Sequence, residues 1–169
     1  MSRKIITGAL IAVVVGVVVA LFVSPFIAAQ ALVRAARTGD AAGLERQVDF
    51  PAFRTSLKSE LNARAALGML LAPSLVEGAV DSFVTPQGIA AMVRSGETPE
   101  PERPVPADDT PAADKDKIRQ SWAYRGLNTF AVTLTRDDRP DDALVLIMER
   151  RTPFTWKLAG VDLTPDPMG

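Results

Sequence analysis

The longest apolar run of the chain covers residues 5–23, where no side chain is charged and Thr7 is the only polar one. A helix of this length spans roughly 28 Å at 1.5 Å per residue, close to the ~30 Å hydrocarbon core of a bilayer. Because lipid offers the backbone no hydrogen-bond partners, a single isolated span has to be helical. The pattern therefore predicts a transmembrane helix, and we assign residues 1–29 to an N-terminal membrane anchor.

Basic residues stand directly before this run and are absent for some distance after it. Arg3 and Lys4 precede it, whereas the next basic residues are Arg34 and Arg37. The positive-inside rule then puts the N-terminus in the cytoplasm. We expect a single-pass protein of the bacterial inner membrane, held there by residues 5–23, with its main domain in the periplasm.

A cleaved signal peptide is the alternative interpretation of the same segment. Ala29, Gln30 and Ala31 form the small-residue pattern of a cleavage site. The apolar region of a signal peptide usually spans about 7–15 residues, and this longer run favours an uncleaved anchor. Both interpretations export the rest of the chain. The chain has no cysteine, so it offers neither a lipid-modified cysteine nor a disulfide framework.

Residues 30–95 show the spacing and the start signals of short helices. Ser24 and Pro25 are typical of a helix start and predict a helix that continues to Thr38, ended by Gly39 in the left-handed conformation. Asp40, Asp49 and Thr85 predict three further starts. Apolar residues three and four positions apart give the buried stripes: Leu44 and Val48; Phe50, Phe53, Leu57 and Leu61; Val76, Ala79, Val80 and Phe83; Ile89, Met92 and Val93.

Residues 96–117 differ sharply in composition from the segments on either side. They contain five prolines and seven acidic residues but no aromatic one. Such a segment buries too little apolar surface to offset its loss of conformational entropy, so we expect a disordered linker.

Residues 118–169 show the alternation typical of strands. Phe130, Val132 and Leu134 alternate with small and polar residues, residues 136–142 predict a turn, and residues 143–148 predict a central strand. Apolar residues change parity near the C-terminus, and a bulge at Ala159-Gly160 would bring them to one face. The chain is therefore predicted to be α+β, with a helical block packed on a small antiparallel β-meander.

Composition excludes several kinds of function. The 19 basic and 20 acidic residues give a net charge of −1, which argues against a nucleic-acid partner. The chain has no histidine and no cysteine, so the usual zinc, haem and nucleophile–histidine chemistries lack their residues. We therefore expect no enzymatic activity, no cofactor and no metal.

Five residues are candidates for contact with a ligand or a partner. Asp49 could point a carboxylate into a cleft, although capping a helix before Pro51 explains it equally well. Arg150 and Arg151 could bind an anionic group or simply form a solvated strand edge. Trp122 and Trp156 could line a pocket, although aromatic residues in a small sheet mostly belong to the core.

Two segments carry a resemblance to a known family. These are ALVRAARTGDAAGLERQVDFPAFRTSLKSEL, which follows the apolar helix, and the closing strand WKLAGVDL. Together they resemble the bacterial domain of unknown function 2939, whose members look like exported or membrane-anchored envelope proteins. The order of helices and curved sheet also resembles the nuclear-transport-factor-2-like folds, a likeness that supplies no function.

These features predict a non-enzymatic binding or scaffolding module that is tethered in the cell envelope. Tethering raises the effective concentration of a domain towards its neighbours, so the expected partner is another envelope protein. The alternative is a periplasmic carrier that encloses a lipid or a small molecule in an apolar pocket.

The predicted topology is tested with reporter domains fused to the C-terminus. We expect a reporter that works only in the periplasm to be active, because Arg3 and Lys4 hold the N-terminus inside. An active cytoplasmic reporter would refute the orientation. A mature protein that begins at Leu32, seen by intact mass, would show a signal peptide instead of an anchor.

Overall fold

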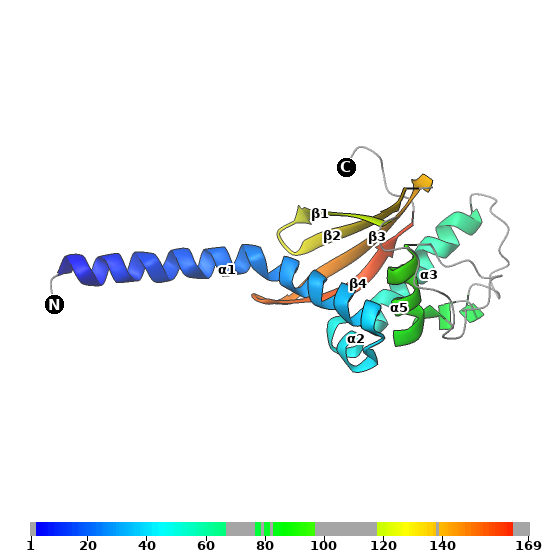
Figure 1. Cartoon of the computed structure of the whole chain (residues 1–169), viewed down its shortest axis with the longest axis horizontal. Helices are drawn as coiled ribbons and strands as arrows, with labels where there is room; N and C mark the ends of the chain where they lie inside the picture. The colour runs from blue at the N-terminus through cyan, green and yellow to red at the C-terminus, as the bar shows by residue number, and fades with distance from the viewer. Residues whose placement is uncertain are drawn as a thin grey trace.

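The fold combines a long N-terminal helix with further helices and one antiparallel sheet, as a computed structural model of the chain shows (Figure 1). The structure describes residues 3–66, 77–78, 80–81, 83–96, 118–137 and 139–163. Within these ranges the helices are α1 (Arg3–Thr38), α2 (Ala41–Gln47), α3 (Phe50–Ala66) and α5 (Pro86–Ser95). The strands are β1 (Ile118–Gly126), β2 (Thr129–Arg136), β3 (Arg139–Thr152) and β4 (Thr155–Asp162). This arrangement confirms the predicted α+β class.

The sheet is a meander in which each strand pairs with the next along the chain. Its order is β1-β2-β3-β4, and every pairing is antiparallel. Val132 of β2 lies opposite Leu146 of β3, which in turn lies opposite Val161 of β4. All three side chains are buried on the face that the helices cover. The period-2 alternation read from the sequence therefore identifies the inner face correctly.

The predicted bulge in the last strand is confirmed. Ile147 pairs with Gly160 and Met148 pairs with Leu158, so Ala159 is the extra residue. The bulge reverses the side-chain parity, and the residues before and after it both face the core. The apolar side chains it brings together are Trp156, Leu158, Val161 and Leu163, all buried.

Helix starts and ends follow the local signals in the sequence. The side chains of Asp40 and Thr85 accept hydrogen bonds from the Gly43 and Gly88 amides, at 2.9 and 3.0 Å. Gly39 and Gly96 adopt φ angles of 68° and 64° behind α1 and α5, where other residues would be strained.

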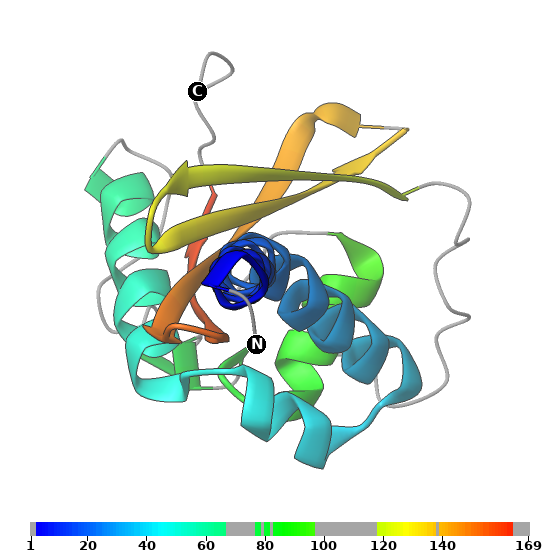
Figure 2. The same cartoon turned by 90° about the vertical axis from the view of Figure 1, so that its left-hand side faces the viewer.

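Helices α1 and α3 pack against the inner face of the sheet, and α2 and α5 pack on α1. α3 packs along β4, while α1 contacts α2, α5 and β4. Figure 2, which looks along α1, shows this helix running between the sheet and the pair formed by α2 and α5. The second half of α1 is thus a central element of the domain, and Ala29, Leu32 and Ala36 are fully buried.

α1 continues where the sequence predicted a new helix start. It runs from Arg3 to Thr38 with Pro25 in its interior, so the prediction that Ser24 and Pro25 begin a helix is wrong. Side chains of residues 6–20 are exposed, in contrast to the buried second half. Ile6–Thr38 is the one described helix long and apolar enough to cross a membrane, a test that a signal sequence also passes.

Two other predictions differ from the structure or lie outside it. Residues 136–142 were predicted to form a turn, yet β3 begins at Arg139. β2 and β3 therefore extend into this polar run, because backbone pairing does not require apolar side chains at a strand end. Residues 97–117 of the predicted linker lie outside the described residues. Of the helix predicted around residues 76–83, residues 77–78, 80–81 and 83 are described, and they are helical as predicted.

Gly160 provides a test of how closely α3 approaches the sheet. A Cβ atom at this position would lie 2.7 Å from Ser56 Oγ, which accepts a hydrogen bond from the Val161 amide at 3.1 Å. We expect Gly160→Ala to lower the free energy of unfolding by about 1–3 kcal/mol, since overpacking displaces this contact. Thermal unfolding of the full chain in detergent micelles measures the change.

Gly126→Ala is the matched control, because a Cβ atom there would meet no atom within 4 Å. We expect its melting temperature to stay close to that of the parent protein. Equal effects of the two substitutions would contradict the close packing at Gly160.

Candidate functional site

α1 passes through Pro25 because a neighbouring hydroxyl satisfies the carbonyl that proline leaves without a donor. Proline has no N–H, so the Leu21 carbonyl four residues earlier lacks its helical partner. Ser24 Oγ donates to this carbonyl at 2.9 Å and accepts a hydrogen bond from Trp156 Nε1 at 2.9 Å. Ser24 therefore both maintains α1 and attaches it to β4.

Aromatic rings from α1 and the sheet surround this joint. Phe26 stacks on Trp122 with ring centroids 5.9 Å apart and meets Phe130 edge-on at 4.8 Å. Each such pair contributes about 0.5–1.5 kcal/mol beyond the area that it buries. We call these residues the aromatic cluster: Phe22, Phe26, Trp122, Tyr124, Phe130 and Trp156.

Tyr124 adds a second polar link between the sheet and α1. Its hydroxyl donates to the Phe22 carbonyl at 2.7 Å, three residues before Pro25. Desolvation raises the pKa of Tyr124, and the charge of Arg150 opposes this shift without cancelling it. The phenol therefore stays protonated at neutral pH, as a hydrogen-bond donor must be.

Arg150 ties both β-hairpins to the aromatic cluster. Its amide donates to the Asn128 carbonyl at 3.0 Å, and its Nη1 donates to the Pro153 carbonyl at 3.2 Å. The guanidinium carbon lies 4.5 Å from the ring centroid of Trp156, within the range of a cation–π interaction. These contacts give Arg150 a structural role in holding the two turns together.

Asp49 and Arg151 form a charged pair at the start of α3. Asp49 Oδ1 accepts a hydrogen bond from the Ala52 amide at 3.2 Å, and its Oδ2 lies 2.7 Å from Arg151 Nη2. Arg151 also contacts Glu149 at 2.9 Å. Both members of the pair are partly exposed, so the ion pair contributes only about 0–1 kcal/mol. Asp49 is thus a helix cap that also binds the neighbouring strand.

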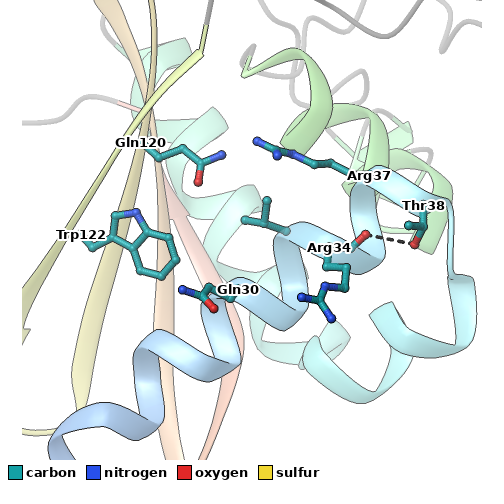
Figure 3. A pocket seen from close by; sticks show the side chains of 7 residues that line it. Gln30, Arg34, Arg37, Thr38, Gln120 and Trp122 are labelled. Carbon is teal, nitrogen blue, oxygen red and sulfur yellow. Dashed lines mark hydrogen bonds between the residues drawn. The ribbon is translucent and has the colours of Figure 1, made fainter. Parts of the chain in front are cut away.

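An open groove separates the second half of α1 from β1. Its volume is about 460 Å³, and we call it the α1–β1 groove. Figure 3 shows Arg37 and Gln120 extending towards one another from its two walls, with the ring of Trp122 beside them. Its lining residues are Gln30, Val33, Arg34, Arg37, Thr38, Gln120 and Trp122.

Charge in the groove is unbalanced among the described residues. Arg34 and Arg37 are exposed and lie on one face of α1, three positions apart. No described acidic side chain pairs with either of them, whereas Arg54, Arg119, Arg125 and Arg151 all have such partners. A guanidinium fork binds carboxylate or phosphate oxygens well, and so the groove suits an anionic group.

The five predicted candidates fall into two places. Asp49, Arg150, Arg151 and Trp156 gather near the β3–β4 turn, where each has a structural partner. Trp122 alone lines the α1–β1 groove. The sequence analysis missed Arg34 and Arg37 as site residues, although their spacing on one helical face was the available signal.

The described residues contain no cluster of three or more acidic side chains placed to hold a metal ion. The arginine, glutamine and threonine side chains that line the groove offer hydrogen bonding and positive charge. Fold and groove together define an α+β domain carried on an apolar N-terminal helix.

Comparison with known families agrees with the resemblance read from the sequence. Residues 14–92 match the family described as "Protein of unknown function (DUF2939)". This match covers the later part of the apolar run and most of the helical block, a little under half of the chain, and supports the family for that part. Neither the curated proteins nor the solved structures contain a match. The likeness to nuclear-transport-factor-2-like folds therefore stays a prediction.

Ser24→Ala tests the joint between α1 and the sheet. The substitution leaves both the Leu21 carbonyl and Trp156 Nε1 without a partner, and each such group costs about 1–3 kcal/mol when buried. We expect a clear loss of stability in denaturant unfolding of the full chain in micelles.

Pro25→Ala provides the matched background for this test. It restores an N–H for the Leu21 carbonyl, so Ser24→Ala should cost less in this background than in the parent protein. The same cost in both backgrounds would show that Ser24 does not compensate for the proline.

Proposed function

We propose that this protein is a non-enzymatic binding module, anchored in the inner membrane, that holds an acidic segment of another envelope protein in its α1–β1 groove. The observation that carries the proposal is that one wall of the groove is the anchor helix itself. Gln30 lies seven residues after the apolar run, or roughly 10 Å along the helix. The groove is thereby held at a fixed height above the membrane.

Signal-peptide cleavage would remove residues that belong to the core of the domain, and this supports an uncleaved anchor. Cutting after Ala31 would delete Ser24, Phe26 and the fully buried Ala29 from the core. Trp156 Nε1 would lose its hydrogen-bond partner in a buried environment, which is costly. The second half of α1 therefore behaves as part of the domain, unlike the end of a removable leader.

The orientation in the proposal rests on Arg3 and Lys4, which favour a cytoplasmic N-terminus. The domain then faces the periplasm, where its partner has to be found. A non-enzymatic role follows from the residues the chain offers, which include neither histidine nor cysteine.

An acidic protein segment suits the groove for three reasons. Arg34 and Arg37 supply two positive charges without a described acidic partner. Gln30 and Gln120 can hydrogen-bond to an extended backbone, and the exposed side of Trp122 offers apolar contact. The groove is open along one side, so a chain can lie across it as well as a small molecule.

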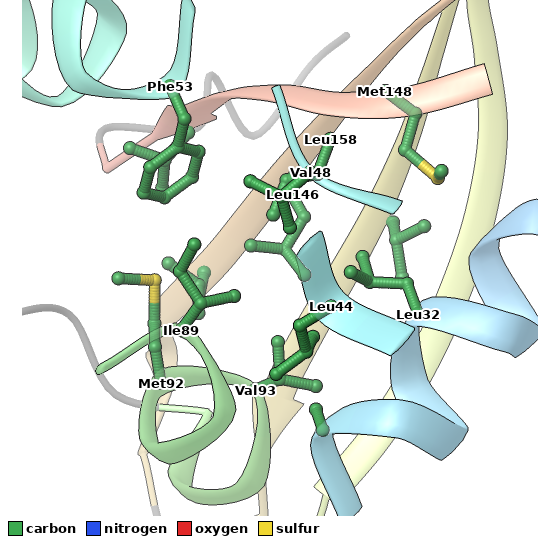
Figure 4. Packing of buried hydrophobic residues seen from close by; sticks show 14 of the residues in the cluster. Leu32, Leu44, Val48, Phe53, Ile89, Met92, Val93, Leu146, Met148 and Leu158 are labelled. Atoms are coloured by element: carbon green, nitrogen blue, oxygen red, sulfur yellow. The ribbon is translucent and has the colours of Figure 1, made fainter. Parts of the chain in front are cut away.

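The alternative function, a carrier with an apolar pocket, requires space between the sheet and the helices. Among the described residues this space is occupied by fully buried side chains from every layer (Figure 4). They include Leu32, Leu44, Phe53, Ile89, Leu146 and Leu158. No observation in the described part of the chain therefore favours the carrier.

The proposal is tested by site-specific photo-crosslinking in the native membrane. A crosslinking amino acid replaces Gln30 at the rim of the groove and, in a control, Ser59 on the exposed face of α3. We expect Gln30 to give one protein adduct that Ser59 does not give. Substituting Arg34→Gln and Arg37→Gln should remove most of this adduct, because charge complementarity is lost.

Arg94→Gln is the matched charge control, since Arg94 is exposed in the last turn of α5 and is not among the residues that line the groove. It should leave the adduct unchanged. A lipid adduct in place of a protein adduct, or an adduct that survives loss of both arginines, would contradict the proposal.

A further inference from the structure

Two β-turns lie at the same end of the sheet. Leu127 and Asn128 connect β1 to β2, and Pro153 and Phe154 connect β3 to β4. In an antiparallel meander, alternate turns lie at one end, and Arg150 confirms this by bonding to both. We call residues 127–128 and 153–154 the hairpin tips.

Each hairpin tip exposes one large apolar side chain. Leu127 is 83% exposed and Phe154 is 54% exposed, the two highest values for a large apolar side chain outside α1 in the described residues. The turns and their flanking residues, 126–129 and 152–155, carry no charge. Single exposed apolar residues are ordinary on protein surfaces, but two on adjacent tips form one apolar end.

This end of the sheet points along α1 towards the apolar run. Gln120 and Trp122 lie beside residues 30–38 of α1, whereas Tyr124 bonds to Phe22. β1 therefore runs towards the N-terminus of α1, and its turn lies beyond the level of Phe22. Figure 1 shows both tips projecting in this direction beside α1.

The level of the tips coincides with the membrane boundary expected for the anchor. Phe22 belongs to the last turn of the apolar run, and Leu127 lies three residues further along than Tyr124. At ~3.3 Å per strand residue, the tip reaches up to about 10 Å further towards the N-terminus of α1. Ile27, which is 64% exposed, lies on α1 beyond Phe22 towards the domain and extends the same apolar surface in that direction.

We propose that the hairpin tips insert Leu127 and Phe154 into the lipid headgroup–acyl boundary, so that the domain docks on the bilayer surface next to its own anchor. This proposal rests on the membrane anchorage proposed above. The apolar surface of the tips is continuous with that of the anchor helix, so we take lipid, and not a protein, to be what the tips contact. Insertion by about 5–10 Å is the depth that interfacial apolar residues reach in membranes.

The residues behind the tips suit the headgroup region. Arg125 and Arg151 stand two and three positions before Leu127 and Phe154. Both side chains are partly exposed, so their guanidinium groups can contact phosphate oxygens beside the carboxylates that they already bind. The phenol of Tyr124 lies at the same level, as is common for tyrosine at membrane interfaces. Two contacts, the anchor and the tips, then fix the tilt of the domain and the direction in which the α1–β1 groove opens.

The test uses the full chain in nanodiscs of phosphatidylcholine and phosphatidylglycerol, one copy per disc. Because the chain has no cysteine, a single one can be introduced and labelled with a fluorophore. Asn128→Cys places the label beside Leu127 and keeps both apolar side chains. Asp137→Cys, which is exposed at the opposite end of the sheet, is the control. We expect nitroxide-bearing lipids to quench the Asn128 label several-fold more than the Asp137 label.

Loss of the apolar side chains should abolish this difference. Leu127→Ser with Phe154→Ser should reduce quenching of the Asn128 label to the level of the control, while the melting temperature changes little because both side chains are exposed. Equal quenching of the Asn128 and Asp137 labels in the unmodified sequence would overturn docking on lipid. So would an Asn128 label shielded from a soluble quencher but not reached by lipid nitroxides.

A label at Val14→Cys separates this outcome from a failure of the anchorage. Val14 lies in the apolar run and is exposed on α1. Lipid quenching at Val14 without quenching at Asn128 would reject the docking while leaving the anchor intact. Absence of lipid quenching at Val14 would reject the anchorage itself, and with it the basis of the docking.

Discussion

The structure depends on α1 remaining one continuous helix while its first half is exposed and its second half is buried in the domain. The two halves join at Ser24 and Pro25. The first half of α1 exposes apolar side chains all around, as a membrane span does, while the second half contributes Ala29, Leu32 and Ala36 to the core. At the junction, the proline removes one backbone donor and the serine hydroxyl replaces it. The same hydroxyl accepts a hydrogen bond from Trp156, so the residue that replaces the missing backbone donor also attaches α1 to the sheet.

This attachment determines where the other features of the molecule lie. Tyr124 and Phe26 hold β1 against α1, so the α1–β1 groove and the hairpin tips keep fixed heights along the helix axis. Arg150 hydrogen-bonds to both hairpin tips. These bonds explain why its guanidinium lies against Trp156 instead of extending into solvent. In the proposed function, a rigid link between anchor and groove presents the ligand surface at a constant distance from the bilayer, which raises its effective concentration towards other membrane-bound partners.

Much of the fold was predictable because it depends on local rules. The caps at Asp40 and Thr85, the glycines at residues 39 and 96, and the bulge at Ala159 all follow from backbone requirements that act over a few residues. Ser24 was misjudged because serine before proline is a good helix start locally, and only the distant Trp156 makes it a link inside a longer helix. The groove was missed for the same reason, since Arg37 and Gln120 face one another only when β1 packs beside α1.

Hydrogen exchange along α1, measured by mass spectrometry on the full chain in nanodiscs, tests the shared helix most directly. If α1 were two helices joined by a flexible linker, the amides of residues 26–31 would lie in that linker, between the membrane span and the domain. A continuous helix docked through Ser24 and the aromatic cluster predicts that they exchange as slowly as those of residues 32–36. Fast exchange between Phe26 and Ala31, with protection on both sides, would show a flexible joint and contradict the account.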